Sequence, residues 1–176
     1  MDQSKKRLLA IDLSSRGFGY AVFDGPKKLV DWGIRRVAGD KNVQCVDRIR
    51  DLMHWYAPEV LVLENTHTVE SRRHPRIRAL SNDVARLAER LDIEVVRINW
   101  ALVRQVCGES GSATKEQIAA HVGEMFPEIK RQAPPKRKPW MSEDERMNLF
   151  DAVALGATAL KAAEVRRSAA QPQQSI

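Results

Sequence analysis

Two acidic residues close apolar segments of the chain, where a carboxylate is unusual. Asp12 follows the run Leu8–Ile11, and Glu64 ends the run VLVLE. Removing an unpaired carboxylate from water is expensive, so such an acid needs a reason. A salt bridge, a helix cap or a strand end that already reaches water explains either acid taken singly. A role in binding or catalysis is the alternative.

A third acid strengthens that alternative. Along the predicted final helix, residues 142–165, Asp144, Asn148 and Asp151 lie on one stripe, at spacings of four and three residues. Asp151 precedes the small-residue run AVALGATAL, which suits close packing against a sheet. Asp144 is also explained as a solvated acid that favours a helix N-terminus. That explanation is weaker for Asp151.

The three acids could meet at one place. If strands 7–13 and 60–64 are parallel neighbours, Asp12 and Glu64 lie together at their carboxyl ends, where α/β proteins bind ligands. Three converging carboxylates repel each other unless a cation intervenes. Oxygen ligands without His or Cys favour Mg²⁺, or Mn²⁺ in its place, over zinc. Two such ions about 4 Å apart can activate a water and stabilise the leaving oxygen of a phosphodiester. The pattern therefore predicts a metal-dependent nuclease.

The elements that position these acids follow from apolar spacing and turn signals. Strands are predicted at 7–13, 17–25, 27–36, 60–64 and 93–99, with Asp24-Gly25-Pro26 as a hairpin turn. Helices are predicted at 43–56, 75–91, 101–107, from Thr114 in a capping-box pattern with Gln117, and at 142–165. Residues 127–140 are expected to form a mobile, proline-rich loop. The order predicts an α/β fold, with a mixed five-stranded sheet, an antiparallel three-strand meander plus parallel strands, flanked by helices.

Composition sets outer bounds on the function. The 176 residues fit one domain, expected at 1–166, followed by a disordered tail at 167–176. The 29 Lys and Arg exceed the 23 Asp and Glu, and the net charge of +6 is compatible with a polyanionic partner. Cys45 and Cys107 form no CxxC pattern, which suits a reducing cytoplasm. No apolar run approaches a membrane span of roughly 18 residues.

Four segments, taken in order, resemble one nuclease family. LLAIDLSSRGFGYAVF, VLVLEN, GSATKEQIAAHV and NLFDAVALGATAL are similar to the acidic strands, the lysine-bearing helix start and the closing helix of the RuvC-type Holliday-junction resolvases. That family has the RNase H-like fold. The likeness covers most of residues 7–162, and it implies a homodimeric, Mg²⁺-dependent endonuclease that makes paired nicks in four-way DNA junctions. Branch-migration proteins would be compatible partners.

The resemblance also assigns roles. It implies metal ligands at Asp12, Glu64 and Asp151, a fourth ligand at Asn148, and a catalytic lysine at Lys115. The family usually has an acid or a histidine at the position of Asn148, so a neutral amide there is a departure, for which Asp144 could compensate. A second departure is Leu13-Ser14 in place of the family's Pro-Gly. A third is His67, where family members can carry an apolar wedge; the imidazole could stack on a base or be an ordinary loop residue.

Basic segments flank the predicted metal centre and are candidates for contacts to the DNA backbone. They contain Arg72, Arg73, Arg76, Arg78, Lys130, Arg131, Lys136, Arg137 and Lys138. A solvated face, or a linker at Pro134-Pro135, is the simpler explanation of such runs. Trp140 is expected to anchor its loop on the core rather than to stack on a base.

Two other functions remain open from the sequence, and the sequence argues against a third. The chain could cut other branched DNA or RNA with the same fold. It could be a catalytically weak junction-binding module, which Asn148 would favour. An actin-like phosphotransferase also begins with an Asp-bearing strand, but the chain has no second phosphate loop and is short for two such lobes.

Overall fold

A five-stranded mixed sheet forms the centre of the molecule in this computed structural model, which describes residues 6–69, 71–108 and 111–170. Its strands are β1 (Arg7–Ser14), β2 (Gly17–Asp24), β3 (Leu29–Arg36), β4 (Val60–Glu64) and β5 (Glu94–Ile98). They lie in the order β3-β2-β1-β4-β5. Strands β1, β2 and β3 pair antiparallel, whereas β4 pairs parallel with β1 and β5. The predicted meander with added parallel strands is confirmed.

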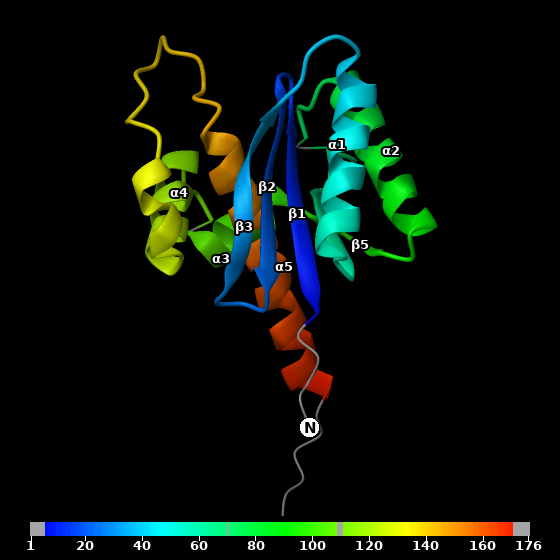
Figure 1. Ribbon diagram of the computed structural model, residues 1–176. Helices are drawn as coiled ribbons and strands as arrows, with labels where there is room; N and C mark the ends of the chain where they lie inside the picture. Colours follow the sequence, from blue (N-terminus) through cyan, green and yellow to red (C-terminus); the bar gives the residue numbers. More distant parts are fainter. Residues whose placement is uncertain (1–5, 70, 109–110, 171–176) are drawn as a thin grey trace, which may run out of the picture.

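Helices cover both faces of this sheet (Figure 1). On one face lie α1 (Lys41–Tyr56) and α2 (Pro75–Arg90). On the other lie α3 (Trp100–Cys107), α4 (Lys115–Met125), the short 3-10 helix η1 (Pro127–Gln132) and α5 (Met147–Ala170). None of the helices in the described part of the chain is long and apolar enough to cross a membrane.

Strand alternation decides which face each residue of β1 and β4 serves. Leu8 and Ala10 of β1 pack in the α5 core, while Leu9 and Ile11 pack in the opposite core against α1 and α2. In β4, Val60 and Val62 likewise pack in the α5 core. Because successive side chains of a strand point to opposite faces, the next positions in these two series, 12 and 64, turn toward α5.

The final helix comes unusually close to the sheet. Every residue of α5 from Leu149 to Leu160 is buried. A Cβ at Gly156 would lie 2.3 Å from the Phe23 ring, and a Cβ at Gly19 of β2 would lie 2.1 Å from the Asn148 carbonyl oxygen. Both glycines are therefore required by close approach rather than by backbone conformation.

Three boundary expectations are wrong. The last helix begins at Met147 rather than 142, because the Asp144 carboxylate accepts the Arg146 backbone N–H in a turn that precedes it. It continues through Ala170, into the expected tail, and residues 171–176 lie outside the described residues. Part of the expected mobile loop is ordered, because η1 buries Ile129 in the core.

Candidate active site

Asp12 and Glu64 meet at the carboxyl ends of β1 and β4. The last residue pair of this parallel ladder is Ile11–Leu63, so the two acids are the next residues along each strand. Asp12 is 1% exposed, and the Glu64 side chain is 11% exposed. One nitrogen, Nη2 of Arg73, lies 2.9 Å from Asp12 Oδ1 and 2.6 Å from Glu64 Oε2. The two carboxylates thus share a single cationic group.

Asp151 reaches the same region from α5. It is 1% exposed, although it lies one helical turn after the start of α5. Its Oδ2 accepts a hydrogen bond from Lys115 Nζ at 2.9 Å. The charges of Asp12 and Asp151 act on each other, and Lys115 attracts both. The structure therefore places Asp12 beside Glu64 through Arg73, and Asp151 within the electrostatic reach of Asp12.

Asp12 and Asp151 lie in surroundings that disfavour their charged forms. Burial raises the pKa of Asp12 to about 6, against the attraction of Arg73 and Lys115. Burial, followed by repulsion from Asp12, raises the pKa of Asp151 to about 7. Among the residues that the structure describes, no group donates a hydrogen bond to the buried Asp12 Oδ2. Burial therefore disfavours the ionised forms of Asp12 and Asp151 more than Arg73 and Lys115 favour them.

Lys115 is fixed by local structure at the first turn of α4. Thr114 and Gln117 form the predicted capping box, with the Thr114 hydroxyl accepting from the Gln117 N–H at 3.2 Å and Gln117 Oε1 accepting from the Thr114 N–H at 2.8 Å. The ammonium lies 5.8 Å from the centre of the Trp100 ring. Burial opposes its charge, but Asp151 and Glu143 outweigh burial and raise its pKa.

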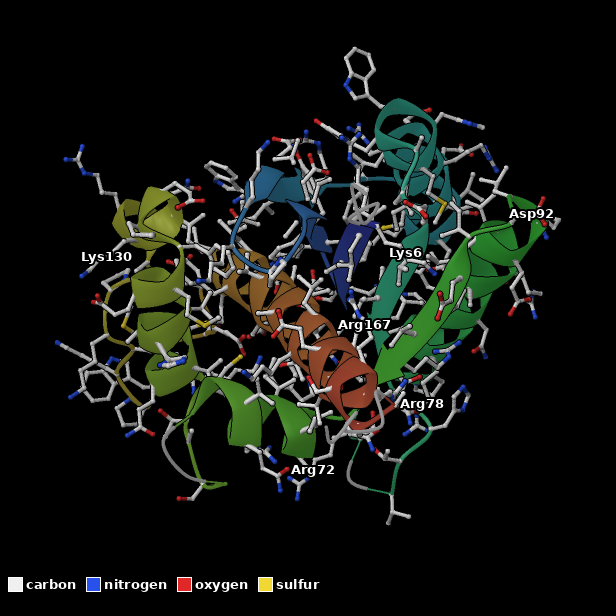
Figure 2. All side chains as sticks on the ribbon, turned by 90° about the horizontal axis from the view of Figure 1, so that it is seen from below. Lys6, Arg72, Arg78, Asp92, Lys130 and Arg167 are labelled. Carbon is white, nitrogen blue, oxygen red and sulfur yellow. The ribbon has the colours of Figure 1, made fainter. Side chains whose placement is uncertain are left out.

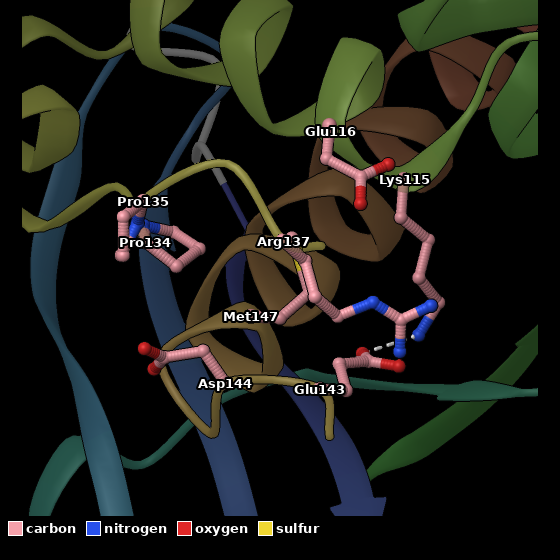
Figure 3. A pocket seen from close by; sticks show the side chains of 8 residues that line it. All are labelled: Lys115, Glu116, Pro134, Pro135, Arg137, Glu143, Asp144 and Met147. Atoms are coloured by element: carbon pink, nitrogen blue, oxygen red, sulfur yellow. Dashed lines mark hydrogen bonds and ion pairs between the residues drawn. The ribbon is translucent and has the colours of Figure 1, made fainter. Parts of the chain in front are cut away.

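Glu143 is a fourth acid at this site, and the sequence analysis missed it. Its Oε1 accepts from Lys115 Nζ at 2.8 Å, and its charge repels those of Asp12 and Asp151. Figure 3 shows the Glu143 carboxylate beside Lys115 at the edge of a pocket that the segment 134–137 borders. Its position in an acidic segment before the helix, SEDER, is the only sequence signal, and solvated acids are common there.

The two proposed supplementary ligands differ in position. Asn148 lies one turn before Asp151 in α5, half-buried, and its side chain makes no hydrogen bond to another described residue. Asp144 is not on this stripe, because it precedes the helix and its carboxylate pairs with the Arg146 guanidinium at 2.7 Å. Figure 3 shows it pointing away from Lys115 and Glu143. Compensation of Asn148 by Asp144 therefore lacks structural support, whereas Glu143 is close to the cluster.

The donor set suits a hard divalent ion. It consists of carboxylate oxygens from Asp12, Glu64 and Asp151, with the unpartnered Asp12 Oδ2 among them. As the side chains stand, no three His, Cys, Asp or Glu residues in the described ranges are arranged to hold an ion. Instead, the Arg73 guanidinium and the Lys115 ammonium lie between the acids.

Most candidate DNA-binding residues lie on the surface. His67, Arg72 and Arg78 are exposed, and His67 Nε2 lies 3.2 Å from Asn82 Oδ1. Arg76 is half-buried and donates to Asn42 Oδ1 at 2.8 Å. Arg73 differs, because its guanidinium is turned into the acid cluster rather than to the surface. Figure 2 shows charged side chains all around the fold, from Lys130 to Asp92, so overall charge alone does not locate a DNA-binding face.

The loop after η1 is the second basic segment. Lys136, Arg137 and Lys138 are exposed, and Arg137 borders the pocket that contains Lys115 and Glu143 (Figure 3). Trp140 is 78% exposed, so the expectation that it anchors the loop on the core is wrong. The Lys138 Nζ lies 5.4 Å from the centre of its ring. Lys130 and Arg131, also exposed, belong to η1, where Lys130 pairs with Glu124.

No protein-family model and no curated protein matches the chain. Several solved structures match the chain. RuvC of Thermus thermophilus is 17% identical, with a TM-score of 0.67 over 90% of this chain and 96% of that chain. The same protein in complex with a Holliday junction substrate is 20% identical, with a TM-score of 0.66 over 91% and 96%. The yeast mitochondrial Holliday junction resolvase is 12% identical, with a TM-score of 0.61 over 93% and 81%.

The architecture is therefore the RNase H-like fold, in the form that RuvC-type resolvases have. The superposition on Thermus thermophilus RuvC covers nearly the whole of both chains, including the mixed sheet. The fold expected from the sequence is confirmed.

Proposed function

We propose that the chain is a structure-selective endonuclease that cuts four-way DNA junctions by divalent-metal-dependent hydrolysis of phosphodiesters. The buried acids Asp12 and Asp151, with the partly buried Glu64 beside Asp12 and Lys115 beside Asp151, carry this proposal, because a fold core has no structural need for an acid cluster with an unpartnered oxygen. The resolvases among the structural neighbours support the choice of substrate.

The acids and the lysine of the cluster have different roles in this mechanism. Asp12, Glu64 and Asp151 would hold Mg²⁺, or Mn²⁺, with the Asn148 amide oxygen as a neutral fourth ligand. A bound pair of ions would activate a water and neutralise the charge on the phosphate. Lys115 would donate a hydrogen bond to a phosphate oxygen, for which its position between Glu143 and Asp151 keeps it protonated.

The surface residues would position the DNA without reading its sequence. Arg72, Arg76 and Arg78 lie on the segment that follows β4, and Lys136, Arg137 and Lys138 lie on the loop that borders the Lys115 pocket. His67 is exposed on the first of these segments and would contact an unpaired base.

A homodimer completes the proposal. A four-way junction has two equivalent strands to cut, and two sites related by a two-fold axis would make paired nicks. Analytical ultracentrifugation should find a dimer, alone or on the junction. A monomer that nicks one strand per encounter would remove this part of the proposal and leave the nuclease.

Cleavage of defined substrates tests the function. A synthetic four-way junction should be cut in Mg²⁺ or Mn²⁺, but not in EDTA, and faster than linear duplex, flaps or RNA–DNA hybrids. Asp12→Asn and Asp151→Asn should abolish cutting and retain junction binding. Asp51→Asn, an exposed acid on α1, is the matched control and should cut normally. Cutting by Asp12→Asn at the wild-type rate would refute the mechanism.

A junction-binding module with weak catalysis is the second candidate. The neutral Asn148, in place of an acid or a histidine, is the observation that favours it. Calorimetric titration with Mn²⁺ separates the two functions: a module of this kind would bind the junction but no ion at millimolar concentration.

A further inference from the structure

Arg73 makes more contacts to the acid pair than a surface arginine would. Its Nε donates to Glu64 Oε2 at 2.7 Å, its Nη1 to the Leu13 carbonyl at 3.1 Å, and its Nη2 to Asp12 Oδ1 at 2.9 Å. All three nitrogens are therefore engaged at the ends of β1 and β4. Its side chain is only 24% exposed.

The path of the chain explains this position. Strand β4 ends at Glu64 and α2 begins at Pro75, with the His74 ring as the N-cap that accepts the Arg76 N–H at 3.2 Å. Arg73 thus stands at the end of the connection, directly before a capped helix. The neighbouring Arg72 is exposed and has no hydrogen bond or ion pair to another described residue.

We propose that Arg73 is a built-in cation that holds the Asp12–Glu64 pair together until a divalent ion displaces it. This inference rests on the proposed function, because it takes both acids as ion ligands. An ion held by both Asp12 and Glu64 would lie in the gap between the two carboxylates, which the guanidinium now fills by contacting Asp12 Oδ1 and Glu64 Oε2. Two cations in that gap also repel each other.

The exchange can be observed directly on the arginine. In ¹⁵N-labelled protein, the Nε–H resonance of Arg73 is assigned by its absence from Arg73→Lys. Saturation with diamagnetic Mg²⁺ should shift this resonance and expose it to exchange with solvent. Binding of Mg²⁺ with the resonance unchanged would overturn the inference and leave the proposed function intact, since the ion would then use Asp12 Oδ2 beside a retained Arg73.

Ion affinity gives a second readout that does not require cleavage. Arg73→Ala should bind Mn²⁺ at least about tenfold more tightly than the wild type, the factor expected from one competing charge-assisted hydrogen bond. Arg86→Ala, at an exposed arginine of α2 outside the proposed site, is the matched control and should bind as the wild type does. Arg73→Lys keeps the positive charge but loses the planar guanidinium, so its Mn²⁺ affinity should lie between those of the wild type and Arg73→Ala. This variant keeps the test valid if Arg73→Ala does not fold in EDTA.

The outcomes separate the two proposals. Equal Mn²⁺ affinity in the wild type, Arg73→Lys and Arg73→Ala would overturn the role of Arg73 alone. No binding by any of them at millimolar ion would overturn both the inference and the proposed function. Binding by Arg73→Ala where the wild type binds none at millimolar ion would support the role of Arg73 as the competing cation and would favour the junction-binding module over the nuclease for the wild type.

Discussion

Replacing Asp12 by asparagine should stabilise the metal-free protein while abolishing its proposed activity. Asp12 is buried, and its Oδ2 accepts no hydrogen bond from the described residues. Its raised pKa already sums the cost of burial and the attraction of Arg73 and Lys115. Because the cost of burial exceeds the attraction of Arg73 and Lys115, the ionised form of Asp12 is less favourable in the folded chain than in the unfolded chain. The neutral amide that Asp12→Asn introduces removes that cost.

The size of the effect follows from the pKa. A rise from 3.8 to about 6 corresponds to up to about 3 kcal/mol at pH 8. For a chain of 176 residues this is a rise in Tm of roughly 6–12 °C. The gain in the free energy of unfolding of Asp12→Asn over the wild type depends on pH. The folded state binds the proton more tightly, so wild-type stability falls as the pH rises from about 4 to about 6, and the advantage of Asp12→Asn disappears below about pH 4.

Thermal and urea unfolding in EDTA, at pH 4 and pH 8, measure this directly. Asp51→Asn, on the exposed face of α1, should change stability by less than about 0.5 kcal/mol at either pH. Addition of Mn²⁺ should stabilise the wild type and not Asp12→Asn. An Asp12→Asn protein that is less stable than the wild type at pH 8 in EDTA would refute the reasoning, since it would mean that ionised Asp12 stabilises the fold.

Three further variants test other parts of the site. Gly19→Ala should lose about 2 kcal/mol or more in urea unfolding, because its Cβ would lie 2.1 Å from the α5 backbone, whereas Gly111→Ala, which meets nothing within 4 Å, should be nearly neutral. Glu143→Gln should lower the cleavage rate about tenfold without changing junction affinity, since it removes an ion-pair partner of Lys115, the proposed catalytic lysine. An equal loss in Glu116→Gln would argue against a specific role of Glu143. Arg72→Ala should lower the slope of log affinity against log salt by about 0.9, and an unchanged slope would exclude a phosphate contact.

Part of the site could be predicted from local sequence because strands have a fixed alternation. Asp12 and Glu64 each stand two residues after an apolar residue that packs in the α5 core, at Ala10 and Val62. Once the two strands are parallel neighbours, both carboxylates must appear on one face at one end. The capping box at Thr114 was equally local, since it depends on two residues three apart.

Other features depended on contacts between distant segments. The start of α5 was misplaced by five residues because helical spacing continues through Asp144, while the turn before Met147 uses that carboxylate locally. Trp140 was expected on the core because large aromatic residues are usually buried, but the path of its loop leaves the ring 78% exposed.

The sequence by itself determined where the acids stand along the chain and which elements carry them, because apolar periodicity and strand ends are short-range properties. Only the tertiary structure decided which cations compensate those acids. Arg73 pairs with Asp12 across 61 residues, and Lys115 pairs with Asp151 across 36. Such pairings depend on the path of connections that have no hydrophobic period, and many basic residues in those connections compete for each acid. Charge supplies the attraction, but packing of α2, α4 and α5 on the sheet selects the partner.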